Sequence, residues 1–402
     1  MSLLDMLSDA ECWESFYCYK TSLISSKSFE RHLRAFIDEK RYLPVCRRIE
    51  EGEPFPLPRR AVISKMSSGK KRVVYTYPEP ENTVLKLLTH LLLRQYDHLF
   101  SPGLFSFRPH RTAKDAVRML SARRGLNRQW SYKADISNYF NSIPIERFLL
   151  ILREALAEDS RLCGFLTSLL TEPSVLSDGE IITEEKGIMA GTPLSAFYAD
   201  LYLADVDAAF AERGVTYARY SDDIIIFASS EQEVREQADF LRQSLTNKGL
   251  TLNPDKECFS SPEEGWSFLG FVCKGGRIDI APATLLKLKH KMRRKARALR
   301  RWSDRTETEG VKAAKAFIRI FNRKLLECSE DNELCWGKWF FPLINTDVSL
   351  KEIDAYAQEC VRFLISGTRT KARFNVRYED MKALGYRSLV NEYYNYKPEG
   401  EQ

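Results

Sequence analysis

The sequence predicts an α+β fold, in which helices and antiparallel strands are mixed rather than strictly alternating. Two observations favour strand hairpins. Alternating apolar residues flank a polar turn at residues 67–70, and a second alternating stretch turns at Asp178-Gly179. A third observation is that the chain from Pro282 onward combines helical apolar spacing with many basic residues. The sequence therefore indicates a mixed first part and a helical last third.

Local patterns justify the expected elements in order. Residues 1–52 predict short helices, because Leu33, Phe36 and Ile37 recur at helical spacing. Residues 192–214 predict one long helix, with Thr192 as its N-cap and a proline in its first turn. The other expected elements are a hairpin over 60–77, helices within 81–100 and 101–120, a strand from 130, helices over 145–170, hairpins over 175–187 and 217–230, a helix over 231–250 that Gly249 ends, and a strand pair over 266–278.

Composition limits the class of protein. The net charge of +6 is mild, and the nine cysteines are scattered without a Cys-x-x-Cys pair, which argues against a zinc site or a disulfide framework. This cysteine usage predicts a reducing, cytoplasmic location. Residues 1–13 lack the basic start of a signal peptide, and no apolar run reaches about 18 residues, so no membrane contact is expected.

Two adjacent aspartates suggest a chemical site. Asp222 and Asp223 lie in "YARYSDDIIIFASS", where β-favouring residues on both sides predict a hairpin with the carboxylates at its tip. Asp135 follows another apolar strand, which could lie beside this hairpin. Adjacent carboxylates repel each other, and a bound Mg²⁺ would remove that conflict. Three carboxylates can hold two metal ions roughly 3.5–4 Å apart for phosphoryl transfer. The alternative is an ordinary aspartate-rich turn.

An ordered series of motifs makes the prediction specific. The chain carries, in order, "KKRVVYTYP", "FSFRPHRTAKDA", "KADISNYFNSI", "KGIMAGTPLSAFYADLYL", "YSDDIIIFAS", "NKGLTLNPDKE" and "WSFLGFV". This series resembles that of bacterial reverse transcriptases close to the group II intron lineage, over about residues 59–273. The resemblance implies a right-hand polymerase, with an N-terminal helical extension (1–58), fingers and palm (59–279), and a helical thumb and C-terminal region (280–402).

The resemblance implies roles for individual residues. Asp135, Asp222 and Asp223 would be the catalytic metal ligands for two Mg²⁺ ions, which Mn²⁺ could replace, and Ile136 would add a backbone carbonyl. Phe140 would be the aromatic gate that clashes with a 2′-hydroxyl and favours deoxynucleotides. The alternative for Phe140 is an ordinary core residue.

Further residues would contact the nucleotide or the nucleic acid. Lys65 and Arg72 in the fingers hairpin would meet the triphosphate, Gly191 would shape the nucleotide pocket and Lys256 would lie near the leaving group. The alternative for the basic hairpin is a solvated surface. Arg108 would contact nucleic acid or form a buried structural pair. The other implied contacts are the primer grip at Leu269 and Gly270.

The chain departs from the family pattern at two places, of which the first affects the expected nucleotide contacts. The family usually has Pro-Gln-Gly where this chain has Met189-Ala190-Gly191, so the glutamine is missing. Asp200 stands where an asparagine is usual. Neither departure alters the three aspartates.

A basic helix is expected in the thumb. Residues 285–301 contain no acidic residue, and their apolar positions recur at helical spacing. One face can therefore pack while the basic face binds a phosphate backbone, with an affinity that falls as salt rises. A solvated surface helix is the alternative. The residues expected to face outward are Lys289, Arg293, Arg294, Arg297 and Arg300.

The remaining resemblance is to stand-alone, defence-associated reverse transcriptases, including the type 2 group. No RNase H or HNH-like pattern follows the thumb, and the Val-Thr-Gly signature of retron enzymes is not found. Membership would imply a structured non-coding RNA encoded nearby as template, dNTPs as substrates, complementary DNA as product, and an antiphage role. The alternatives are template-independent or protein-primed synthesis, a retron or intron-type enzyme, and a non-catalytic RNA-binding scaffold. The sequence leaves the oligomeric state open.

Overall fold

The computed structural model describes residues 2–23, 26–64, 71–327, 335–368 and 370–396. Lys65 and the turn of the first hairpin lie outside these residues. The chain forms two compact units, Met1–Leu23 with Phe29–Glu264, and Ile24–Ser28 with Gly265–Gln402. The expected division into extension, fingers with palm, and thumb stays a prediction. In the described part of the chain, no helix is both long and apolar enough to cross a membrane.

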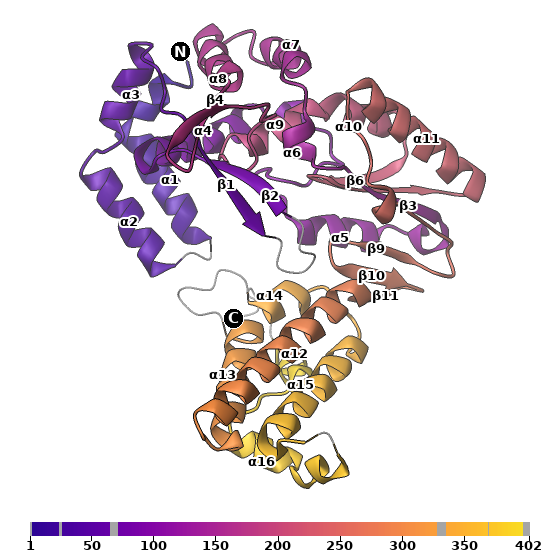
Figure 1. Ribbon diagram of the computed structural model, residues 1–402. Coiled ribbons are helices and arrows are strands. Elements are labelled where there is room, and N and C mark those ends of the chain that lie inside the picture. Colours follow the sequence, from indigo (N-terminus) through magenta and orange to yellow (C-terminus); the bar gives the residue numbers. More distant parts are fainter. Residues whose placement is uncertain (1, 24–25, 65–70, 328–334, 369, 397–402) are drawn as a thin grey trace. The chain divides into compact units, whose positions relative to one another are not determined.

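The first sheet joins the two predicted hairpins (Figure 1). Its strand order is β2-β1-β4-β5, and β1 pairs antiparallel with β2 and parallel with β4. Asp178 and Gly179 turn between β4 and β5 with positive φ angles of 51° and 91°, as type I′ hairpin turns require. The strands are β1 (Arg59–Ser64), β2 (Lys71–Thr76), β4 (Ser174–Ser177) and β5 (Glu180–Thr183).

The second sheet carries the carboxylates and has the order β6-β7-β3-β8. All its pairings are antiparallel. The apolar residues of β7 between Asp223 and Ala228 are almost completely buried, which explains their unbroken apolar pattern. The strands are β3 (Trp130–Asp135), β6 (Thr216–Tyr220), β7 (Asp223–Ala228) and β8 (Cys258–Ser260).

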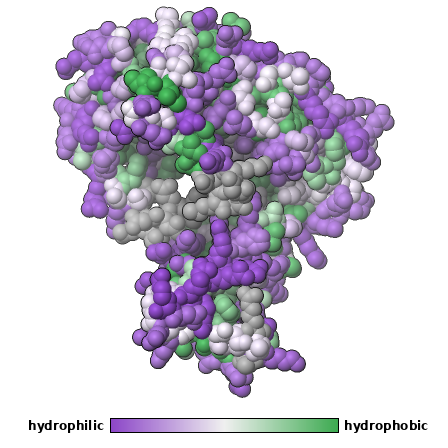
Figure 2. All heavy atoms as spheres, in the orientation of Figure 1, coloured by the Kyte–Doolittle hydropathy of each residue, from purple (hydrophilic) through white to green (hydrophobic). Residues whose placement is uncertain are grey.

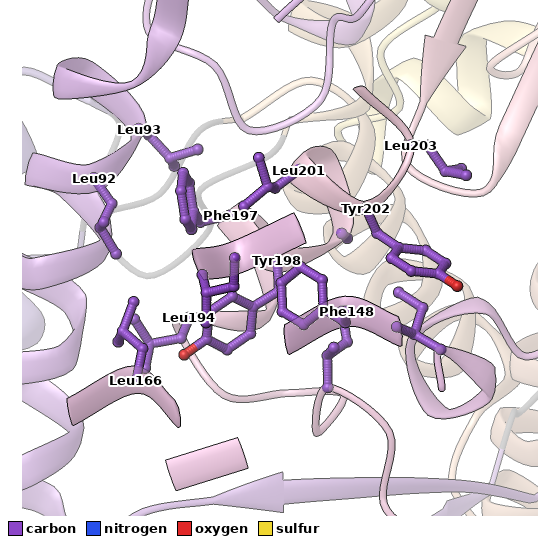
Figure 3. Packing of buried hydrophobic residues seen from close by; sticks show 14 of the residues in the cluster. Leu92, Leu93, Phe148, Leu166, Leu194, Phe197, Tyr198, Leu201, Tyr202 and Leu203 are labelled. Carbon is purple, nitrogen blue, oxygen red and sulfur yellow. The ribbon is translucent and has the colours of Figure 1, made fainter. Parts of the chain in front are cut away.

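Helices bury the apolar core of the first unit. Figure 3 shows Phe197 and Tyr198 of α9 among Leu93 of α4, Phe148 of α7 and Leu166 of α8. The rings of Phe148 and Tyr198 meet edge to face, with centroids 5.2 Å apart. The α-helices are α1 (Ala10–Ser22), α2 (Lys27–Asp38), α3 (Leu43–Glu50), α4 (Glu79–Gln95), α5 (Ala113–Ala122), α6 (Tyr139–Ser142), α7 (Ile145–Ala155), α8 (Ser160–Thr171), α9 (Ser195–Tyr202), α10 (Ala204–Glu212) and α11 (Glu231–Asn247). The short 3₁₀ helices are η1 (Asp5–Ser8), η2 (Asp97–Leu99), η3 (Leu126–Arg128) and η4 (Pro254–Lys256).

The prediction of one long helix over 192–214 is wrong. The segment forms α9 and α10, because Leu203 leaves helical geometry with φ −110° and ψ 11°. Thr192 is not the N-cap, because its hydroxyl donates to the carbonyl of Met189 at 3.0 Å rather than accepting from the helix. By contrast, α11 ends before Gly249, which has φ 76°, as predicted.

The second unit combines a small sheet with helices. Its sheet has the order β11-β10-β9, so the expected strand pair has a third member, added after the turn at Gly275-Gly276. Helices α12, α13 and α15 pack against one another. The elements are β9 (Trp266–Phe268), β10 (Phe271–Lys274), β11 (Arg277–Ile280), α12 (Pro282–Arg305), α13 (Gly310–Leu325), α14 (Trp336–Phe340), α15 (Val348–Ser366), η5 (Lys371–Asn375), α16 (Tyr378–Ala383) and α17 (Leu389–Asn395).

Candidate active site

Three carboxylates meet where β3 ends beside the β6–β7 hairpin. Asp135, the last residue of β3, lies directly opposite Asp223, the first residue of β7. Tyr220 also pairs with Asp223, so Asp222 lies in the tight turn between β6 and β7. One carboxylate oxygen from each aspartate lies within 4.8 Å of the other two. The strand that ends in Asp135 therefore lies beside the hairpin, as the sequence predicts.

The backbone on both sides of the cluster is held by hydrogen bonds. The Ile136 amide donates to the Asp222 carbonyl at 3.0 Å, and the Asn253 amide donates to the Asp135 carbonyl at 2.8 Å. The carbonyl oxygen of Ile136 accepts no hydrogen bond from the described residues. It therefore remains available as an oxygen ligand.

Burial and repulsion between carboxylates raise the pKa of Asp222 and Asp223. Burial raises the pKa of Asp222, and the nearby charge of Asp135 adds to the effect. Burial also raises the pKa of Asp223 to about 6; Lys133 opposes this shift, while Asp222 and Asp135 reinforce it. These shifts mean that the side chains of the protein do not fully neutralise the carboxylates.

The donor set fits a hard divalent cation. Its members are all carboxylates, and such oxygen ligands suit Mg²⁺ and Mn²⁺, whereas zinc sites favour thiolate and imidazole. A bound cation would stabilise the ionised forms that burial and repulsion penalise. The chemistry of the residues present is therefore consistent with a magnesium site.

Lys256 reaches the cluster from the segment after α11. Its ammonium donates to Oδ2 of Asp135 at 2.5 Å. The segment runs along the end of β3, where the Ser137 amide donates to the Thr251 carbonyl at 2.9 Å. The Lys256 side chain is 47% exposed, whereas that of Asp135 is only 7% exposed. The structure thus places a solvent-accessible cation on the buried carboxylate.

Arg72 and Phe140 lie on the same side of the site. The Arg72 guanidinium carbon lies 5.9 Å from the centre of the Phe140 ring, and its charge acts to lower the pKa of Asp222 against the net rise. Phe140 is half-buried, whereas Tyr139 is fully buried and donates its hydroxyl to the Ala199 carbonyl at 2.5 Å. Tyr139 is therefore the core residue of this pair, and part of the Phe140 ring stays accessible.

Gly191 lies where a loop joins β2. A Cβ at this position would lie 3.0 Å from the Tyr75 carbonyl oxygen, and its φ of 102° already favours glycine. The Tyr75 amide donates to the Ala190 carbonyl at 2.8 Å. Asn141, which the sequence analysis missed, accepts from the Ala190 amide at 3.3 Å and donates to the Val73 carbonyl at 3.4 Å. The signal in the sequence that could have identified Asn141 is its position directly after Phe140.

A buried charged network supports the turn, and the sequence analysis missed it. Arg219 is fully buried and donates to both carboxylate oxygens of Asp207, with a shortest distance of 2.6 Å. It also donates to the Ser221 carbonyl at 3.3 Å, next to the carboxylate cluster. Asp200 accepts from the Ser106 hydroxyl at 2.7 Å and lies 3.8 Å from the Arg219 guanidinium. Burial raises the pKa of Asp200 to about 8. At neutral pH, Asp200 is therefore mostly protonated within this network.

Arg108 has a structural environment, and its contact with nucleic acid stays a prediction. Its guanidinium forms two short hydrogen bonds with Asp97, at 2.7 and 2.9 Å, and donates to the Ser101 carbonyl at 2.7 Å. Its side chain is only 6% exposed. The donors that would reach a phosphate are already occupied, which supports the alternative of a buried structural pair.

The expected basic face of α12 divides into two groups. Lys289 is ion-paired with Glu352, and Arg300 with Asp304 at 2.6 Å. Their side chains are 21% and 29% exposed, so both are partly buried and paired with neighbouring carboxylates, and their contact with nucleic acid stays a prediction. Figure 2 shows strongly hydrophilic residues over this helix. The exposed members of the predicted set are Arg293, Arg294 and Arg297.

The predicted primer grip forms a tight turn of the second unit. Leu269 and Gly270 connect β9 to β10 with positive φ angles of 49° and 90°. The Gly270 carbonyl accepts from the Ala281 amide at 2.8 Å, just before α12. The contact of this turn with a primer stays a prediction.

Comparison with known proteins gives the family. Residues 63–273 match the family model described as reverse transcriptase (RNA-dependent DNA polymerase). The retron Ec86 reverse transcriptase of Escherichia coli is 31% identical over 94 residues, which cover 22% of this chain and 29% of that protein. An uncharacterized 91 kDa protein in a cob intron of Schizosaccharomyces pombe is 27% identical over 150 residues, which cover 37% of this chain and 18% of that protein. The aligned region thus spans less than a third of each curated relative.

Solved structures of telomerase are more distant. The apo telomerase of Candida tropicalis superposes with a TM-score of 0.49 at 12% identity, covering 85% of this chain and 63% of that one. Telomerase of Candida albicans, solved with a fragment of telomeric RNA, gives a TM-score of 0.45 at 11% identity, covering 84% of this chain and 67% of that one.

The match to the family model extends over more than half of the 402 residues and contains all three clustered aspartates. The chain belongs to the reverse transcriptase family.

Proposed function

We propose that the protein is an RNA-directed DNA polymerase that copies an RNA template into complementary DNA from dNTPs. The observation that carries the proposal is the cluster of Asp135, Asp222 and Asp223 within the family-matching segment 63–273. A structural turn has no need of three converging, partly buried carboxylates, two of which have a raised pKa, whereas a metal-dependent polymerase requires such carboxylates.

Asp135, Asp222 and Asp223 are proposed to hold Mg²⁺, with the Ile136 carbonyl as a further ligand and Mn²⁺ as a substitute. When bound, Mg²⁺ would neutralise charge on the triphosphate and activate the primer 3′-hydroxyl. Lys256 keeps a positive charge on the buried Asp135 carboxylate and stays accessible to a phosphate leaving group.

Residues on the fingers side are proposed to select the nucleotide. The planar guanidinium group of Arg72 can donate two parallel hydrogen bonds to the triphosphate. The accessible part of the Phe140 ring is proposed to exclude a 2′-hydroxyl. Gly191 is proposed to line the nucleotide pocket without a side chain, because a Cβ there would contact β2. Lys65 is proposed to join Arg72 at the triphosphate on the family pattern alone.

The test is primer extension on a defined RNA template with Mg²⁺ and labelled dNTPs. The Asp222→Asn/Asp223→Asn variant keeps the side-chain shape but loses the charges, and we expect it to lose extension by at least about 1,000-fold. The matched control is Asp239→Asn, whose carboxylate is 74% exposed on α11. If the double variant extended the primer as well as the control, the proposed function would be wrong.

The template and the biological role are proposed more narrowly. Among bacterial reverse transcriptases, the remaining resemblance is to stand-alone, defence-associated enzymes, so we propose a structured non-coding RNA as template and a role in antiphage defence. Sequencing the RNA and DNA that copurify with the wild type and with Asp222→Asn/Asp223→Asn tests this directly. One RNA enriched with both proteins, with matching DNA only from the wild type, is expected. Specific RNA without DNA, even during phage infection, would favour a binding scaffold instead.

A second candidate is synthesis that does not follow a template, or that starts from a protein. The observation that favours it is Met189-Ala190-Gly191, which offers no glutamine to the nucleotide. Met189 is buried and accepts the Tyr77 hydroxyl on its sulfur at 3.8 Å, so its side chain is committed to packing. Primer extension on a template with a scrambled sequence separates templated from untemplated synthesis: a complementary product supports templated copying, and an unrelated product supports untemplated synthesis.

A further inference from the structure

A cavity of about 410 Å³ lies in the second unit, among α12, α15 and η5. Its size falls within the range of small-ligand sites, roughly 300–1,000 Å³. It belongs to no part of the proposed polymerase site. The lining residues that matter for its chemistry are Arg293, Arg297, Tyr356, Glu359, Phe363 and Arg373.

The cavity has an excess of positive charge. Arg293 and Arg297 are four residues apart on α12, so they share a face, and both are exposed. Within the described ranges, neither has an ion-pair or hydrogen-bond partner. Glu359 cannot neutralise them, because Arg373 donates to one of its oxygens at 2.7 Å and Arg362 donates to the other at 3.0 Å.

The opposite wall is aromatic. Tyr356 and Phe363 are seven residues apart on α15, which places them on one face of that helix, and both are half-buried. Both rings line the cavity, and the Lys289 ammonium lies 5.5 Å from the centre of the Tyr356 ring. A free inorganic anion would make no use of this wall, and an apolar ligand would make no use of the two free guanidinium groups.

A nucleotide matches both walls. An unstacked base packs on aromatic side chains, and a phosphate accepts bidentate hydrogen bonds from arginine. Paired bases are already stacked and cannot enter, so the ligand must come from a single-stranded loop, bulge or end.

We propose that this cavity binds one unpaired nucleotide of an RNA, with the base against Tyr356 and Phe363 and the phosphate at Arg293 and Arg297. The proposal deepens the proposed function, because it rests on RNA being the partner of the chain. It gives α12 two roles: general attraction of phosphates by its exposed basic residues, and selection of unpaired RNA by the cavity.

The test compares two charge-matched double variants of the full chain. Arg293→Ala/Arg297→Ala removes the two cavity charges. Lys291→Ala/Lys295→Ala removes two charges with the same spacing from exposed positions of α12 that do not line the cavity. Fluorescence anisotropy measures the affinity for a single-stranded RNA and for a fully paired RNA of the same length, across a salt series and without dNTPs.

We expect the cavity variant to bind single-stranded RNA at least about 10-fold more weakly than the control variant, while both bind the duplex equally. Tyr356→Leu, which keeps an apolar side chain, should also weaken single-strand binding about 5-fold without changing duplex binding. Equal losses for both double variants on single-stranded RNA would overturn the proposal.

The assay separates this proposal from the proposed function. Binding is measured without polymerisation, so a wild type that makes no DNA can still show the cavity effect. Conversely, if the wild type copies RNA but the cavity variant and the control variant bind single-stranded RNA equally well, only the binding role proposed for the cavity is refuted.

Discussion

Replacing Asp200 with asparagine should change how the stability of the first unit depends on pH. Asp200 is fully buried 3.8 Å from Arg219, it accepts from Ser106, and burial raises its pKa to about 8. Arg219 and Arg108 oppose this shift, whereas Asp207 adds to it. Between the ordinary aspartate pKa of 3.8 and about 8, the folded protein therefore holds a proton that the unfolded chain has released.

The sign and size of the effect follow from proton linkage. The contribution of Asp200 to stability is complete below the ordinary pKa and is lost as pH rises toward about 8. One proton changes the free energy of unfolding by at most about 1.4 kcal/mol per pH unit. Over two pH units below pH 8, the wild type should lose up to roughly 3 kcal/mol relative to Asp200→Asn, which carries no ionisable group there. For a unit of this size, that corresponds to roughly 5–10 °C in Tm.

Hydrogen exchange read by mass spectrometry on peptides of β6 and β7, at increasing urea and several pH values, measures this quantity without interference from the second unit. The difference between wild type and Asp200→Asn cancels the other titrating groups that do not contact Asp200. Asp239→Asn, an exposed carboxylate in the same unit, is the control and should follow the wild type. Parallel pH profiles for wild type and Asp200→Asn would refute the reasoning, because Asp200 would then be ionised in the folded protein.

Three further predictions concern the site. Lys256→Met removes the ammonium group that contacts Asp135, so primer extension should slow about 10-fold. The Mg²⁺ concentration that gives the half-maximal rate should fall, because no side-chain cation then competes for Asp135. An unchanged Mg²⁺ titration would contradict this. Gly191→Val places a branched side chain at a φ of 102° and against the Tyr75 carbonyl, so the free energy of unfolding should fall by about 1–3 kcal/mol. Thermal unfolding measures this loss, and Gly191→Ala should be closer to the wild type. An unchanged Tm for Gly191→Val would argue against the close approach. Phe140→Ala should raise ribonucleotide incorporation relative to deoxynucleotide incorporation about 10-fold in single-nucleotide extension, and an unchanged ratio would remove its gating role.

Local patterns predicted the elements that carry the carboxylates. The aspartate pair is flanked by β-favouring residues on both sides, and Asp135 ends an apolar strand, so a hairpin and a neighbouring strand could be inferred from short stretches. The sheet then brings Asp135 opposite Asp223 because β3 pairs with β7. The pairing of β3 with β7 depends on the whole fold. It could be predicted from the order of the motifs, whereas the periodicity of apolar residues does not show which strands are neighbours.

Interactions between distant charged residues could not be predicted in the same way. Arg219 and Asp207 pair across a helix and a strand, and no local spacing marks such a pair. Arg108 is buried and paired with Asp97, and Lys289 is paired with Glu352 from another helix. A basic residue looks the same in sequence whether it binds a phosphate or a carboxylate of the protein, because tertiary packing determines its partner.

The position of β3 in the second sheet has a consequence for biosynthesis. β3 ends at Asp135, but both of its partner strands, β7 and β8, come later in the chain, and β8 ends only at Ser260. Until β7 leaves the ribosome, both edges of a strand with buried apolar side chains remain unpaired. The edge that pairs with β8 stays unpaired until Ser260 has been made, and such edges promote aggregation. A nascent or truncated chain that stops before Cys258 should therefore depend on chaperones, and the carboxylate cluster can assemble only late in synthesis.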